Sequence, residues 1–182
     1  MLLYRCFAWN KRARPVDRDG PLWFPRELQG EGRHDNPDAY GCLYVTDRPV
    51  SAVVEQLARF RGQRLTEGML LRRRLPLALG AIELPNERRV VDLDDPAVLT
   101  AHELRPSLVA TRRREVTQPQ ALELFRRHRR AAALRWWSTY EALWANFTVF
   151  DRAAPALRLA DVRRLRIDDP DVAEAADMLG IT

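Results

Sequence analysis

Short apolar runs and amphipathic stretches follow one another along the chain without a regular order. The apolar runs are four to seven residues long, the length of buried strands, and turn residues separate many of them. They predict strands at residues 2–8, 40–45, 69–75, 79–84, 89–93, 134–137 and 146–150, with weaker candidates at 157–159 and 165–167.

Helical spacing of apolar residues begins after the second of these strands. Asp47 is placed to cap a helix, and Pro49 suits its first turn. The apolar stripe comprises Val50, Val53, Val54, Leu57 and Phe60. Three further helices are predicted from their start signals: Asp95-Pro96 through Leu104, the capping box Thr117-Gln118-Pro119-Gln120 to about Ala132, and Asp169-Pro170 to near Gly180.

The order of these elements predicts an α+β fold. Strands and helices do not alternate regularly, as they would in a doubly wound parallel sheet. No repeat or flexible linker interrupts the 182 residues, so we expect a single domain over residues 1–182. Residues 10–37 are polar, rich in glycine and proline, and predicted to form a long loop. Loops of this length in a compact domain are usually functional or disordered.

Composition excludes several classes of protein. The chain is 46% hydrophobic and 30% charged, as expected for a soluble globular protein. No apolar run approaches the roughly 20 residues that span a bilayer, and the stretch before Arg5 is too short for a signal peptide. We therefore expect a cytoplasmic protein without a membrane partner. Cys6 and Cys42 form no CxxC pair, and the histidines lack metal-ligand spacing, so we expect neither disulfides nor a metal.

Positive charge is plentiful, but its pattern is weakly informative. The net charge is +5, and the 30 basic residues include a single lysine, Lys11, so the other 29 are arginines. This skew is typical of a GC-rich coding sequence and weakens arginine abundance as a sign of phosphate binding. The basic runs at 72–74, 112–114 and 126–130 are interpreted first as a solvated face. A nucleic-acid surface and a face for an acidic protein partner remain alternatives.

Three residues stand out as candidates for chemistry, each beside an ordinary structural explanation. Arg33 follows Gly30-Glu31-Gly32, and a glycine-bounded arginine can approach a phosphate, although on these residues alone a solvated loop arginine is the more usual interpretation. Glu55 has small neighbours on its helix that leave room for a ligand, but it could simply pair with Arg59. Ser138 ends an aromatic strand, where a serine is usually a turn cap. A P-loop, a dinucleotide-binding glycine motif and a GxSxG elbow are all missing.

Taken together and in order, these segments resemble the RES domain family, which is named for a dispersed Arg, Glu and Ser. The resemblance extends from Tyr4 to about Leu159. Its blocks are Tyr4-Arg5, Gly32-Arg33, Gly41-Cys42-Leu43-Tyr44-Val45, Ala52-Val53-Val54-Glu55, Val90-Val91-Asp92-Leu93-Asp94-Asp95-Pro96, Trp137-Ser138-Thr139 and Asn146-Phe147-Thr148-Val149-Phe150. The sequence departs from the family at His34, where members commonly have tryptophan or tyrosine, and in the added residues 12–27 and 140–145.

The resemblance implies a fold like that of ADP-ribosyltransferases, with mixed, largely antiparallel sheets and flanking helices. It implies a toxin of a bacterial toxin–antitoxin pair that consumes NAD⁺ by phosphorolysis or hydrolysis of the nicotinamide–ribose bond. NAD⁺ is then a substrate and not a cofactor, and inorganic phosphate is a potential co-substrate. The implied partner is a small DNA-binding antitoxin protein. Dimerisation is plausible from the family, and direct binding to nucleic acid is not expected.

The resemblance also assigns roles to residues of this chain. Glu55 would stabilise the ribose cation, and Arg33, with Arg5 second, would hold the pyrophosphate or inorganic phosphate. The ring of Tyr44, or less favourably that of Tyr40, would stack on nicotinamide, and Ser138 would hydrogen-bond the ribose or a phosphate.

Two other functions stay open. The same residues could transfer ADP-ribose to a target protein. A non-enzymatic binding module with a basic face is the alternative from another class. Product mass separates the first from NAD⁺ cleavage, and a steep salt dependence of binding would indicate a nucleic-acid surface.

Overall fold

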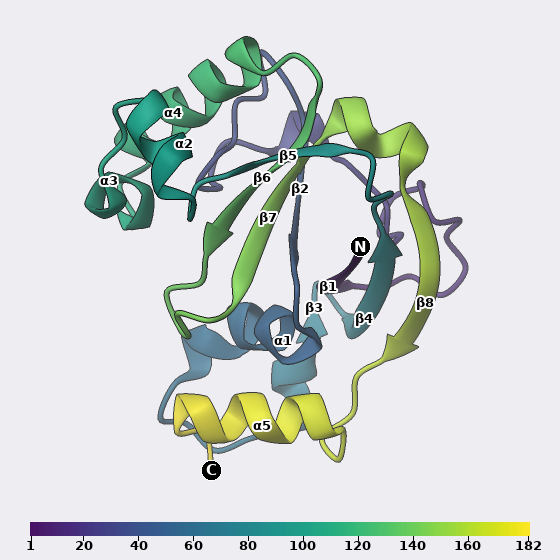
Figure 1. Ribbon diagram of the computed structural model, residues 1–182. Coiled ribbons are helices and arrows are strands. Elements are labelled where there is room, and N and C mark those ends of the chain that lie inside the picture. Colours follow the sequence, from purple (N-terminus) through teal and green to yellow (C-terminus); the bar gives the residue numbers. More distant parts are fainter. The chain divides into compact units, whose positions relative to one another are not determined.

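The computed structural model describes residues 1–182 and divides into two compact units, each described here by itself (Figure 1). The first unit combines three segments of the chain and the second combines two. The first comprises Met1–Trp23, Val45–Leu84 and Leu157–Thr182, and the second comprises Phe24–Tyr44 and Pro85–Ala156.

The first unit is built on antiparallel strands. Its strands are β1 (Leu2–Ala8), β3 (Leu71–Arg72), β4 (Leu75–Glu83) and β8 (Arg158–Arg164). Strand β4 pairs with the other three, and its register with β1 runs from Leu2 opposite Glu83 to Ala8 opposite Leu77. Strand β2 (Cys42–Thr46) enters this unit at Val45, and its last residue lies opposite Tyr4 of β1.

Two helices pack together in the first unit. Helix α1 (Pro49–Leu57) is followed by the 3₁₀ turn η2 (Ala58–Phe60), and η3 (Glu67–Leu70) leads into β3. Helix α5 (Pro170–Leu179) contacts α1 and buries one apolar side, comprising Val172, Ala175, Ala176 and Leu179. It ends at Gly180, whose φ of 62° is the left-handed conformation that glycine adopts readily.

The second unit combines a parallel and an antiparallel strand pair. Strand β6 (Ala131–Trp137) pairs parallel with β5 (Arg89–Asp92) and antiparallel with β7 (Ala145–Phe150). Its helical elements are η1 (Arg26–Leu28), α2 (Pro96–Ala101), α3 (Pro106–Ala110), α4 (Arg114–Arg127) and η4 (Asp151–Ala156). Helices α2, α3 and α4 lie together in Figure 1. They enclose a core that includes Leu99, Val109, Leu124, Leu134 and Phe150.

The α+β prediction is confirmed, because every strand pairing given above except that of β5 with β6 is antiparallel and helices flank the strands. The strand at 2–8 and the helices beginning at Pro96 and Pro170 lie where the sequence predicts them. None of the helices combines the length and the apolar character that a transmembrane segment requires.

Several local predictions are wrong. Arg48, and not Asp47, is the N-cap of α1, and no side chain caps that end. Helix α4 begins three residues before the predicted capping box and contains Pro119 in its interior. The hydroxyl of Thr117 donates instead to the backbone oxygen of Arg33, at 2.6 Å, so a contact distant in sequence replaces the local cap.

The boundaries of weaker elements also differ. Of the strand predicted at 69–75, only Leu71–Arg72 and the first residue of β4 are extended, because Arg73 and Arg74 take positive φ and turn the chain. Residues 165–167 form no strand; β8 (Arg158–Arg164) lies before them instead. The short helix α3 (Pro106–Ala110) has no counterpart in the sequence analysis.

Candidate functional site

A buried carboxylate, Asp35, organises the loop that carries Arg33. Its Oδ2 accepts the backbone N–H groups of Gly30 at 2.8 Å and Gly32 at 2.7 Å. Its Oδ1 accepts the hydroxyl of Tyr44 at 2.7 Å and the thiol of Cys42 at 3.2 Å. Burial alone would raise the pKa of Asp35, but these four hydrogen bonds outweigh it and lower that pKa below its ordinary value. Asp35 is therefore a charged anchor and not a proton donor at neutral pH.

Position 32 requires glycine, because the Asp35 and Tyr44 side chains approach its Cα closely. A Cβ at this position would lie 2.5 Å from both the Asp35 Oδ1 and the Tyr44 hydroxyl oxygen. No side chain fits there without displacing one of them. From helix α4, the Gln118 amide donates to the carbonyls of Gly30 and Gly32, both at 2.9 Å. The loop is thus tied to strand β2 and to helix α4.

The Arg33 side chain is oriented by its surroundings. Its Nη1 donates to the backbone carbonyl of Val109, in the last turn of helix α3, and to that of Thr111, directly after the helix. Its guanidinium carbon lies 4.5 Å from the ring centroid of Trp136 on β6, a cation–π distance. Arg33 is therefore a partly buried, positioned cation and not a freely solvated loop arginine.

The next residue, His34, is buried and neutral. Its Nδ1 shares a hydrogen bond of 2.8 Å with the Thr148 hydroxyl, which also accepts the indole N–H of Trp136 at 3.3 Å. Burial, helped by the charge of Arg33, lowers the pKa of His34 to about 3. His34 stands where RES members commonly have an aromatic residue, and here its ring packs edge-on against Trp136 at 5.5 Å.

This histidine predicts a pH dependence of stability. Because its pKa is lowered on folding, the unfolded chain binds the proton first, so stability falls as pH drops from about 6.5 toward 3. Lowering the pH from 7 to 5 should reduce the free energy of unfolding by about 2 kcal/mol through protonation of His34 in the unfolded chain. Asp35 also stabilises the folded protein at neutral pH, because its pKa is lowered on folding. This stabilisation is lost only at a lower pH than that of His34.

Urea unfolding at pH 7 and pH 5 measures this effect. His34→Asn should reduce the difference between the two pH values. The pKa of His102 is also lowered by burial, so His102 contributes with the same sign, and the comparison is made in a His102→Asn background. If the unfolding free energies at pH 7 and pH 5 differ as much in His34→Asn as in the parent, His34 is not the source of the pH dependence.

The two tyrosine candidates occupy different positions. Tyr40 has no exposed surface, packs against the rings of Phe125 and Phe150, and donates its hydroxyl to the His34 carbonyl at 2.7 Å. This is the position of a core residue. Tyr44 is partly exposed, and its hydroxyl accepts the His34 N–H at 2.9 Å while donating to Asp35. Tyr44 also packs against the hydrophobic core of this unit, and stacking of its ring on nicotinamide stays a prediction.

Ser138 lies directly after strand β6 and is 3% exposed. Its backbone N–H donates to the Trp144 carbonyl at 2.8 Å, and its Oγ accepts the Tyr140 N–H at 3.2 Å. The hydroxyl thus caps the turn between β6 and β7, as expected for a serine at a strand end. No described contact of this hydroxyl involves a general base.

Removing the Ser138 hydroxyl should show how much it contributes to the stability of the protein. Ser138→Ala is expected to lower the free energy of unfolding by about 1 kcal/mol, because the part-buried hydrogen bond from the Tyr140 N–H is lost. Urea denaturation measures it, with the exposed neighbour Thr139→Ala as the matched control. A Ser138→Ala protein as stable as the control would contradict the capping role.

Glu55 and Arg5 lie in the first unit. Glu55 is exposed on helix α1, whose other face buries Val53, Val54 and Leu57. The Nη1 of Arg5 on β1 donates to the Pro21 carbonyl at 2.8 Å, with longer contacts to the carbonyls of two neighbouring residues. Burial lowers the pKa of Arg5 to about 10. Arg5 therefore holds the loop at residues 20–23.

The comparisons with known proteins decide the family. The sequence matches the family model described as the RES domain over residues 2–172. The chain belongs to the RES domain family. No curated protein matches this RES domain.

A solved structure resembles the fold. It is the crystal structure of the M. tuberculosis MbcT–MbcA toxin–antitoxin complex, with a TM-score of 0.62 and 17% sequence identity over 98% of this chain and 88% of that chain. At this identity the likeness concerns the fold. The RES domain match agrees with the order of blocks found in the sequence.

Sequence reasoning missed the residues that hold the candidate arginine in place. Asp35 was not singled out, although an acidic residue three positions after Gly32 can accept backbone N–H groups in a turn. Thr117 was interpreted as a helix cap, and nothing local indicates its bond to Arg33. No group of three or more His, Cys, Asp or Glu side chains gathers as a metal site would require.

Proposed function

We propose that this RES domain consumes NAD⁺ by breaking the bond between nicotinamide and ribose. The observation that carries the proposal is the family match over residues 2–172, which includes Arg33, Glu55 and Ser138. The anchored Arg33 loop supports it, because a fixed cation is what recognition of a phosphate requires.

Glu55 is proposed to stabilise the transition state. When the C–N bond breaks, its electron pair goes to the ring nitrogen, and nicotinamide leaves as a neutral molecule. Positive charge then develops on the ribose, and a carboxylate beside it lowers the energy of that cation. An oxygen of water or phosphate forms the new bond to the ribose carbon, and any proton on that nucleophile is released to solvent.

The remaining residues are proposed to bind and orient NAD⁺. Arg33 holds the pyrophosphate or an attacking phosphate, and the Tyr44 ring stacks on nicotinamide. Ser138 hydrogen-bonds the ribose or a phosphate in addition to capping its turn. Arg5 stays the second candidate for phosphate; its Nη1, like that of Arg33, also donates to backbone carbonyls. Tyr40 is a weaker candidate for stacking, because its ring is fully buried.

The biological role follows as part of the same proposal. We propose that the chain is the toxin of a toxin–antitoxin pair, with a small DNA-binding protein as its antitoxin. The structure with the similar fold comes from a toxin–antitoxin complex, which supports this assignment.

Incubation of the purified protein with NAD⁺, with and without inorganic phosphate, tests the activity. Loss of NAD⁺ only with phosphate would establish phosphorolysis, and loss in both would establish hydrolysis. Loss that requires an added protein, which gains the mass of ADP-ribose, would establish transfer instead. Stable NAD⁺ under all three conditions, with a folded protein, would overturn the proposal.

A further inference from the structure

An arginine-rich pocket lies in the second unit, away from Ser138. It has a volume of about 470 Å³. Its lining residues are Glu87, Arg88, Arg89, Arg129, Arg130, Ala131, Ala132, Arg152 and Ala153. Ala131 begins strand β6 and Ser138 follows its end, and a seven-residue strand is roughly 20 Å long. The pocket is therefore separate from the part of the candidate site that Ser138 marks.

One arginine builds the wall of this pocket. The Nη1 of Arg152 donates to the carbonyls of His128 at 3.2 Å and Arg129 at 2.6 Å, and its Nη2 donates to that of Phe125 at 3.2 Å. Its guanidinium carbon lies 3.4 Å from the centroid of the Phe125 ring. These contacts fix the turn between α4 and β6, which carries Arg129 and Arg130. The pocket has a defined frame and is not only a group of solvated side chains.

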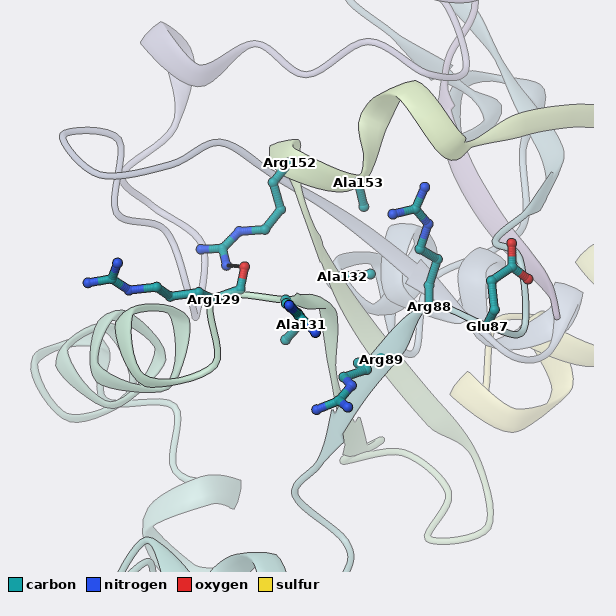
Figure 2. Close-up of a pocket in the computed structure, with 9 residues that line it drawn as sticks. Glu87, Arg88, Arg89, Arg129, Ala131, Ala132, Arg152 and Ala153 are labelled. Atoms are coloured by element: carbon teal, nitrogen blue, oxygen red, sulfur yellow. Dashed lines mark hydrogen bonds between the residues drawn. The ribbon is translucent and has the colours of Figure 1, made fainter.

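The other arginines of the pocket lack carboxylate partners. Three other arginines of this unit are paired with carboxylates: Arg113, Arg114 and Arg135. No ion pair of the structure involves Arg88, Arg89, Arg129 or Arg130. Figure 2 shows Arg129 and Arg152 on one side of Ala131 and Ala132, with Arg88 and Arg89 on the other.

Charge and shape together indicate the class of ligand. Five arginines and one glutamate give the pocket a formal charge of +4, and its volume exceeds that of one phosphate. Guanidinium groups bind phosphate oxygens in paired hydrogen bonds. The basic groups line one concavity, which favours a compact anion over an extended nucleic-acid backbone.

A second, partly apolar pocket of about 630 Å³ adjoins the first and shares Arg89, Arg129 and Arg130 with it. Its own lining includes Val91, Val98 and the ring of His102. An apolar group attached to a phosphate chain therefore has a place beside the arginines. We propose that the arginine pocket binds an oligophosphate, either inorganic or as the phosphate chain of a nucleotide, at a site distinct from the one proposed for NAD⁺ cleavage.

Calorimetric titration of the whole protein with inorganic tripolyphosphate at physiological salt tests this inference. Arg129→Glu with Arg130→Glu is expected to weaken binding by at least about tenfold. The matched control is Arg61→Glu with Arg64→Glu, which makes the same change in net charge at exposed positions of the first unit. It should bind nearly as the parent does.

Comparing tripolyphosphate with ATP distinguishes an inorganic oligophosphate from a nucleotide as the ligand. Equal affinity for tripolyphosphate and ATP would support an inorganic oligophosphate, and tighter binding of ATP would support a nucleotide whose base enters the adjoining pocket. The proposal is overturned if tripolyphosphate does not bind, or if both double variants weaken it equally. It is also overturned if a single-stranded RNA binds where tripolyphosphate does not, which would make this face a nucleic-acid surface.

Discussion

Glu55→Gln is expected to slow NAD⁺ consumption by about a hundredfold or more while leaving the stability of the protein unchanged. Glutamine keeps the size of the side chain but carries no charge to stabilise the ribose cation, and losing such a stabilising group typically costs 10²–10³ in rate. Glu55 is exposed on α1, so its replacement disturbs no core packing. Rates of nicotinamide release and urea denaturation measure the two quantities.

The matched control for this variant is Glu174→Gln, an exposed glutamate on the other long helix of the same unit, α5. It should cleave NAD⁺ at the parent rate. Glu55→Gln with parent activity would remove the carboxylate from the proposed mechanism. A Glu55→Gln protein that is also unfolded would show instead that this side chain is structural.

Asp35→Ala is expected to lower the free energy of unfolding by about 3 kcal/mol, because two backbone N–H groups and the Tyr44 hydroxyl lose their acceptor. For a chain of this size such a loss lowers Tm by roughly 6–12 °C. The loop carrying Arg33 also loses its anchor, so activity should fall more steeply than stability. Thermal and urea unfolding measure the first effect, and initial rates at a permissive temperature measure the second.

Asp38→Ala, at an exposed carboxylate nearby, is the control and should be close to neutral. Asp35→Asn should lie between the two, since one oxygen can still accept hydrogen bonds. If Asp35→Ala proves as stable as Asp38→Ala, the network around Asp35 does not hold the loop as described.

Local signals in the sequence account for much of the fold. Strand β1 is predicted with both ends correct, because an apolar run leads directly into polar loop residues. Helix α5 is predicted from Asp169-Pro170 and Gly180, where proline in the first turn and a left-handed glycine at the end are local properties. Such features need no knowledge of distant residues.

Contacts between distant residues account for the errors. In the sequence Thr117 resembles a helix cap. In the structure its hydroxyl donates to the backbone oxygen of Arg33, 84 positions earlier. The turn at Arg73 and Arg74, both at positive φ, divides the run that is predicted as one strand at residues 69–75. Glycine spacing indicates Arg33 itself, but its stacking on Trp136 and its bonds to the carbonyls of Val109 and Thr111 require tertiary structure.

The mass spectrum of the small molecules left after the purified protein acts on NAD⁺ tests the central claim most directly. The account predicts free nicotinamide together with ADP-ribose or its phosphate adduct, and far less of both with Glu55→Gln. Recovery of unchanged NAD⁺ from the folded parent protein, with and without phosphate and with no added protein modified, would contradict it.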